Sequence, residues 1–189
     1  MIDAAFPEPV LQAQACFRAV LDAMARPGRV FGVDAGFAPP APLAPATASV
    51  LLTLADHETP LWLDADSAEA RDWVAFHCGA PVLADPARCG FAVALGPMDL
   101  QRLPAGTHET PERSATLIQQ VRALGTGRRY RLVGPGLREP ALLAVDGLAE
   151  DFAVAWAANH ARFPRGVDLI LCAGTRLAAL PRSVGVTEA

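Results

Sequence analysis

Residues 89–96, CGFAVALG, form a continuous apolar run between two glycines. A strand without alternating polar positions is typical of a sheet that is covered on both faces. This segment therefore requires one packed layer above the sheet and another below it. A chain of 189 residues is long enough to provide both layers within one domain.

Helical and extended patterns alternate along the rest of the chain. Helices are expected at residues 8–26, 47–56, 67–79 and 147–161, and single strands at 29–33 and 59–64. Two hairpins are expected, one around Gly125-Thr126-Gly127 and one around Gly174-Thr175. Because hairpins exclude a purely parallel sheet, the sheet is expected to be mixed. We predict one α/β domain over residues 1–189. Its architecture is expected to be three-layer α/β/α with a mixed sheet.

The first predicted helix carries apolar residues at three- and four-residue steps, namely Val10, Phe17, Val20, Leu21 and Met24. This spacing gives a single apolar stripe, which is expected to face the core.

The segment ARPGRV ends this helix, because a proline disfavours helical geometry at the residue before it. Arg26 and Arg29 stand on either side of Pro27-Gly28. Two guanidinium groups at a helix end have three interpretations, which the sequence leaves open. They can form a solvated turn, a contact surface for a partner, or an anion site.

Two further places offer candidate site residues. His57 lies between Asp56 and Glu58 in ADHE. The sequence is consistent with two interpretations: these residues provide acid–base groups, or they form an ordinary polar turn. Arg165 follows Arg162 in the second basic turn, HARFPRG. Together with ARPGRV, this turn could form a positive surface for a phosphorylated ligand or an acidic partner.

Several kinds of chemistry are excluded or unsupported by the residues present. All 16 basic residues other than histidine are arginines. Without lysine, the chain cannot form a Schiff base with pyridoxal phosphate or place a P-loop lysine on a nucleotide. The cysteines and histidines lack metal-ligand spacing, so neither a metal nor another cofactor is expected. No nucleophile elbow and no glycine-rich dinucleotide loop is present, so we assign no catalytic residue.

Charge and hydropathy limit the partners. The net charge of −4 argues against nucleic-acid binding, which needs a basic surface. Only 19% of residues are charged, and such a thinly charged surface favours association with other subunits. The start, MIDAAFPEPV, carries an acid where a signal peptide needs positive charge. We therefore expect a cytoplasmic protein that does not insert into a membrane.

Several segments together resemble the PhnH family of the phosphonate carbon–phosphorus lyase system. They follow the family's order along most of the chain: FRAVLDAMARPG, ATASVLLTLADHETPLWL, FHCGAPVL, ATLIQQV, RLVGPGL and FPRGVDLILCAG…RLAALPRS. None of these segments is a catalytic signature. The resemblance therefore rests on their order and spacing.

The resemblance implies a subunit of a core assembly with PhnG, PhnI and PhnJ, in which each subunit is present twice. The family supports formation of α-D-ribose 1-methylphosphonate 5-triphosphate from ATP and methylphosphonate, whereas cleavage of the C–P bond belongs to PhnJ. It also implies a homodimer and a fold like that of pyridoxal-phosphate-dependent transferases, without the cofactor.

Two roles follow from the resemblance. The chain is either an accessory interaction subunit or a component that contributes nucleotide- or phosphonate-binding groups to a shared active site. For ligand or partner contact, the leading candidates are Arg26, Arg29, His57 and Arg165.

Overall fold

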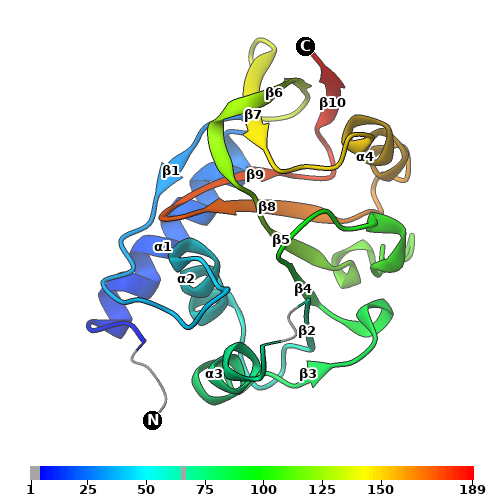
Figure 1. Ribbon diagram of the computed structural model, residues 1–189. Coiled ribbons are helices and arrows are strands. Elements are labelled where there is room, and N and C mark those ends of the chain that lie inside the picture. Colours follow the sequence, from blue (N-terminus) through cyan, green and yellow to red (C-terminus); the bar gives the residue numbers. More distant parts are fainter. Residues whose placement is uncertain (1–4, 65–66) are drawn as a thin grey trace.

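The computed structural model describes residues 5–64 and 67–189 and builds them around a mixed sheet of seven strands (Figure 1). In spatial order the strands are β1 (Phe31–Gly32), β9 (Arg176–Leu180), β8 (Asp168–Ala173), β5 (Thr116–Gln120), β4 (Phe91–Ala94), β2 (Leu61–Leu63) and β3 (Val82–Leu83). The five strands from β8 to β3 are parallel, and β9 is antiparallel to both of its neighbours. The prediction of an α/β protein with a mixed sheet is confirmed.

The apolar run at 89–96 forms β4 inside this sheet. Ala92 and Val93 are completely buried although they point to opposite faces. Val93 is in register with Ile118, and both pack into the core on the helical side. Ala92 is in register with Leu117, and both pack into the core on the other side. The predicted strand with two covered faces is confirmed.

Three helices cover one face of the sheet: α1 (Pro9–Ala25), α2 (Pro45–Leu54) and α3 (Ala68–Cys78) (Figure 1). They match the predicted helices, with ends shifted by one or two residues. The cap signals explain the ends of α3. The Ser67 hydroxyl accepts a hydrogen bond from the Ala70 amide at 3.2 Å, and Gly79 adopts a left-handed φ of 65°.

The other face is covered by a three-stranded antiparallel sheet and a single helix. These elements are the strands β6 (Ala123–Val133), β7 (Ala141–Asp146) and β10 (Gly185–Glu188) and the helix α4 (Phe152–His160). Three short 3₁₀ helices lie elsewhere along the chain: η1 (Pro86–Arg88), η2 (Leu100–Arg102) and η3 (Pro111–Arg113). The predicted α/β/α layering therefore holds on one side only. The second layer is mainly β because Tyr130 and Leu132 alternate with exposed arginines, so that this segment buries one strand face.

The first predicted hairpin is wrong. Residues 116–120 form β5 inside the main sheet, and β6 runs straight through Gly125-Thr126-Gly127. Leu124 and Arg128 both oppose Val145 of β7, so the glycines form a bulge instead of a turn. The second hairpin is confirmed, since β8 and β9 pair antiparallel on either side of Gly174-Thr175.

Candidate functional site

The turn after α1 is fixed by contacts with the second sheet. The helix ends at Ala25, and the Arg29 amide donates to the Arg26 carbonyl at 3.2 Å. Gly28 has a φ of 88°, and a Cβ there would lie 3.1 Å from Leu132 and 3.2 Å from Ala141. A residue with a side chain would therefore force the turn away from β6 and β7.

This turn forms one wall of a groove, which we call the arginine groove. The opposite wall is the connection between β6 and β7, and the cavity measures about 520 Å³. Its lining consists of Arg26, Pro27, Gly28, Arg29, Gly136, Leu137, Arg138, Glu139, Ala141 and Leu142. The structure thus places Arg26 and Arg29 in one site and adds a third guanidinium group, from Arg138.

The local sequence pattern does not indicate Arg138 as a site residue. The segment GPGLREP indicates a turn, but local pattern does not show which surface that turn contacts. The contact depends on Gly136, since a Cβ at this position would lie 2.5 Å from the Ala25 carbonyl oxygen. The missing side chain lets the two turns approach each other.

The charges in the groove are mainly positive. Arg26 pairs with Asp22 one helical turn earlier at 2.5 Å, and both side chains are nearly half exposed. Glu139 is the one acid among the lining residues, against three arginines. The groove therefore favours an anionic ligand or an acidic protein segment.

The exposed face of α1 continues this surface. Val10, Phe17 and Leu21 are 81%, 44% and 52% exposed, so the prediction that they face the core is wrong. The buried positions of the helix are Cys16, Val20 and Ala23 instead. The apolar residues occupy more than half of the helix circumference, so the pattern does not show which part of them is buried. The small side chains at positions 16, 19 and 23 are the ones that fit against the sheet.

A second depression joins α1 to the arginine groove. It is lined in part by Leu21, Met24 and Ala25 from α1 and by Pro135 and Gly136 from the β6–β7 connection. Gly136 belongs to both depressions. The end of α1 and the β6–β7 connection therefore form one continuous surface of apolar and basic groups.

His57 and Arg165 do not line the arginine groove. His57 is exposed in the turn after α2, and its Cβ would lie 3.8 Å from a Cβ placed on Gly79 at the end of α3. Beside it, the hydrogen bond from the Thr59 hydroxyl lowers the pKa of Asp56. This geometry is that of a polar turn between helix and strand.

Arg165 follows the cis peptide bond Phe163–Pro164, beyond the end of α4. Its Nε is buried and has no hydrogen-bond partner among residues 5–64 and 67–189. The two basic turns therefore do not share one cavity, and the four candidate residues lie in three places.

The thiols are buried and protonated at neutral pH. Burial raises the pKa of Cys78 and Cys172 to about 12 and that of Cys89 to about 11. Within the part of the chain that the structure describes, no group of three or more His, Cys, Asp or Glu side chains is positioned to hold a metal ion. None of the described helices is long and apolar enough to cross a membrane.

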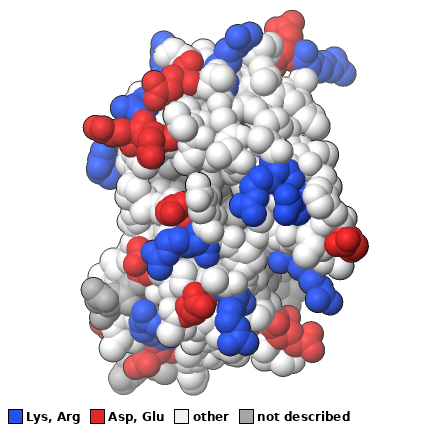
Figure 2. Space-filling view, turned by 90° about the vertical axis from the view of Figure 1, so that its right-hand side faces the viewer, with Lys and Arg blue, Asp and Glu red and all other residues white. Residues whose placement is uncertain are grey.

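On the face shown in Figure 2, arginines and acidic side chains stand in small separate groups. That face has no continuous basic stripe of the kind that follows a nucleic-acid backbone.

Comparison with known proteins gives the family. The profile described as "Bacterial phosphonate metabolism protein (PhnH)" matches residues 4–187. The subunit PhnH of α-D-ribose 1-methylphosphonate 5-triphosphate synthase from Rhizobium meliloti (strain 1021) is 41% identical, over 95% of this chain and 92% of that protein. A putative C–P lyase subunit, HtxG, from Stutzerimonas stutzeri is 33% identical over 92% of this chain and 85% of that protein. The chain therefore belongs to the PhnH family of bacterial phosphonate metabolism proteins.

Proposed function

We propose that this chain is the PhnH subunit of a carbon–phosphorus lyase core complex. In that role it supports formation of α-D-ribose 1-methylphosphonate 5-triphosphate from ATP and methylphosphonate. The observation that carries this proposal is the 41% identity to the Rhizobium subunit, which extends over 92% of that protein. Counterparts of PhnG, PhnI and PhnJ are the expected partners.

Within this assembly, the chain acts as an interaction subunit. Its support is the continuous surface formed by the exposed face of α1 and the arginine groove. Val10, Phe17 and Leu21 expose apolar surface along α1, and the depression lined by Leu21 adjoins the basic groove, an arrangement typical of a protein interface. The absence of lysine and the raised pKa values of the thiols agree with a subunit that supplies no nucleophile of its own.

We also propose that the chain forms a homodimer through α1. The exposed side of this helix carries apolar residues together with Arg18, Asp22 and Arg26. A two-fold contact places the same surface on both subunits and therefore needs both signs of charge on it. Helix α1 meets this requirement, because an antiparallel pair can bring the Asp22 carboxylate near an arginine of the second copy.

The second candidate function is a contribution to a shared nucleotide or phosphonate site. The three arginines of the arginine groove favour it, because guanidinium groups bind phosphate oxygens in bidentate geometry. Calorimetry with the isolated chain and ATP distinguishes the two functions. Binding that is lost on Arg29→Ala would favour the shared site over the interaction role.

Three further properties belong to this proposal. The chain is a single domain over residues 1–189, it is cytoplasmic, and its fold is of the pyridoxal-phosphate-dependent transferase type without the cofactor. The sequence supports the absence of the cofactor, since the aldimine lysine of such enzymes has no counterpart in this chain.

A growth assay tests the proposed function. A bacterial strain that lacks its own PhnH subunit is supplied with this chain and given methylphosphonate as its only phosphorus source. Restored growth, together with normal growth of the same strain on phosphate, is the expected result. Failure to grow although the chain is expressed and folded would count against the subunit role.

A further inference from the structure

Helix α4 is apolar on its outer side as well as on its inner side. Phe152 and Trp156 are buried, whereas Val154 is 74% exposed and Phe163, just beyond the helix, is 58% exposed. No residue from 152 to 159 carries a charge. A helix that is hydrophobic all round is normally buried on every side.

The outer side of α4 lies on an open surface of the isolated chain. Its exposed positions include three alanines, Ala157, Ala158 and Ala161, which allow another backbone to approach closely. Figure 2 views the side of the molecule on which α4 lies in Figure 1, and the upper half of that face shows a broad area without charged side chains. With nine residues, α4 is far shorter than a membrane span, so another protein is the appropriate cover.

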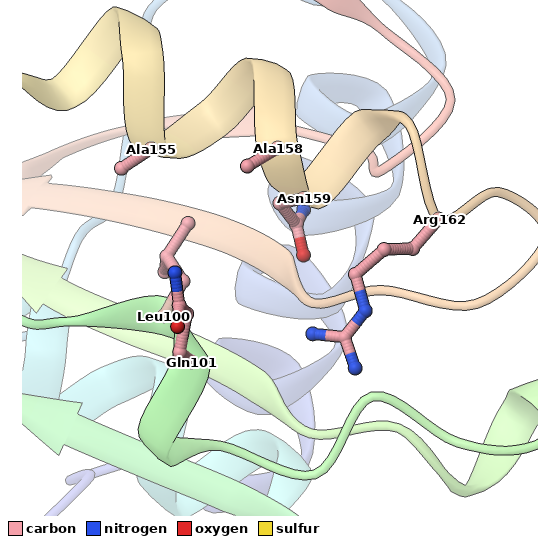
Figure 3. A pocket seen from close by; sticks show the side chains of 6 residues that line it. All are labelled: Leu100, Gln101, Ala155, Ala158, Asn159 and Arg162. Atoms are coloured by element: carbon pink, nitrogen blue, oxygen red, sulfur yellow. The ribbon is translucent and has the colours of Figure 1, made fainter.

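A cavity of about 320 Å³ lies beside this helix, between α4 and η2. Its lining residues are Leu100, Gln101, Ala155, Ala158, Asn159 and Arg162. In Figure 3 the Arg162 side chain extends from the end of the helix toward this space, and the short side chains of Ala155 and Ala158 leave it open.

The guanidinium group of Arg162 is the one charged group among the residues that line the cavity. The Asn159 amide is already used, because it accepts from the Val167 amide at 2.8 Å and donates to the Val167 carbonyl at 2.9 Å. No acid belongs to the lining. Among the described residues, none forms a hydrogen bond or ion pair with the Arg162 side chain. The cavity therefore offers one cation without a partner in the described part of the chain, next to the exposed apolar residues Val154 and Phe163.

We propose that the outer face of α4 and this cavity form the docking surface for a segment of a different subunit. That segment presents apolar side chains to Val154 and Phe163 and one carboxylate to Arg162. A protruding acid fits this arrangement, because the cation is set back in a cavity with no acid of its own. We assign self-association to α1, which carries both signs of charge on its exposed face. The inference rests on the proposed subunit role and adds the surface through which the chain binds a different subunit.

Affinity purification of the co-expressed assembly tests this surface. Val154→Asp and Arg162→Glu are expected to lower the amount of retained partner subunits by about tenfold, because both changes place a wrong charge at the centre of the contact. Phe76→Asp and Arg88→Glu are matched controls, since Phe76 is 67% exposed on α3 and Arg88 is exposed on η1. Both controls are expected to retain the partners at the wild-type level.

The outcomes separate this inference from the proposed function. If the Val154 and Arg162 variants retain the partner subunits at the wild-type level, the proposed docking surface is overturned and the subunit role remains intact. A wild-type preparation without partners overturns both. Two other results also overturn the docking surface. One is a homodimer that is lost in the Arg162 variant, and the other is Arg162-dependent binding of inorganic phosphate by the isolated chain with assembly unchanged. Unfolding curves of the variants check that each of them folds.

Discussion

Arg182 and Asp168 form a forked ion pair between the start of β8 and the turn that leads into β10. The Arg182 Nε lies 3.1 Å from both carboxylate oxygens, and a terminal guanidinium nitrogen donates to the same group. The Arg182 amide also donates to this carboxylate, at 2.7 Å. The other terminal nitrogen donates to the Pro111 carbonyl at 2.8 Å. One side chain thereby joins β8, the β9–β10 turn and η3.

Arg182→Ala is expected to lower the free energy of unfolding by about 2–3 kcal/mol. The loss leaves the Pro111 carbonyl without its donor and the Asp168 carboxylate with only the backbone amide of residue 182, and the two paired side chains are only 16% and 20% exposed. Arg182→Lys should recover part of this loss, since an ammonium group keeps the charge but cannot bind the carboxylate in the bidentate geometry of a guanidinium group. Urea unfolding monitored by tryptophan fluorescence measures both effects. Equal stability of the alanine variant and the wild type would show that the pair does not hold these elements together.

The bulge in β6 depends on Gly127. A Cβ at this position would lie 2.6 Å from the Val145 carbonyl oxygen, at a φ of 89°. Gly125 has a similar φ of 93°, but the nearest atom to its Cβ would be 3.9 Å away. Gly127→Ala should therefore destabilise the protein by about 2 kcal/mol or more, and Gly125→Ala by about 1 kcal/mol.

Thermal unfolding of the two glycine variants measures this difference. Gly96→Ala is the neutral control, because a Cβ there meets no atom within 4 Å. Identical losses for Gly125 and Gly127 would mean that backbone conformation, and not contact with β7, makes glycine necessary in this bulge.

The thiols are expected to resist alkylation in the folded protein. Burial raises the pKa of Cys78 from 9.0 to about 12 and that of Cys89 to about 11, so the reactive thiolate is scarce at neutral pH. Mass spectrometry after iodoacetamide treatment should detect unmodified protein at pH 8 and fourfold alkylation in denaturant. Rapid modification of the native chain would contradict the burial of these residues.

The raised pKa values of the buried thiols also predict that the protein loses stability at alkaline pH. The unfolded chain releases thiol protons near pH 9, whereas the folded chain keeps them until about pH 12. The stabilisation is therefore complete below pH 9 and decreases as the pH rises from 9 toward 12. Urea unfolding at pH 8 and pH 10 checks the sign, and a cysteine-to-serine variant at position 78 should show a weaker pH dependence.

The arginine groove is expected to take part in assembly. Arg26→Ala and Arg138→Glu should each weaken complex formation or growth on phosphonate without unfolding the protein, because both side chains are at the surface. Arg88→Ala is the matched control, since Arg88 is an exposed arginine on η1 that belongs neither to the groove nor to α1. Unchanged assembly and unchanged growth in the Arg26 and Arg138 variants would remove the groove from the interface.

The sequence predicted those elements whose signals are local. Ser67 and Gly79 mark the ends of α3, the apolar run around Val93 requires two covered faces, and Gly174-Thr175 joins two adjacent strands. It failed where distant partners decide the structure. The glycines at 125 and 127 have the chemistry of a turn, and their role as a bulge depends on the pairing of β6 with β7.

The candidate site shows the same division. Arg26 and Arg29 were found because proline and glycine mark their turn. Arg138 could not be found in this way, since it reaches the groove only through the packing of Gly136 on Ala25. The sequence pattern places Phe17 and Leu21 in the core, because an interface and a core carry the same apolar pattern, whereas the structure exposes both side chains.

Native mass spectrometry of this chain, co-expressed and purified with its PhnG, PhnI and PhnJ counterparts, tests the central claim most directly. The subunit role predicts a stable assembly that contains two copies of this chain. A chain that remains alone under these conditions, while binding nucleotide or phosphonate through the arginine groove, would contradict that role.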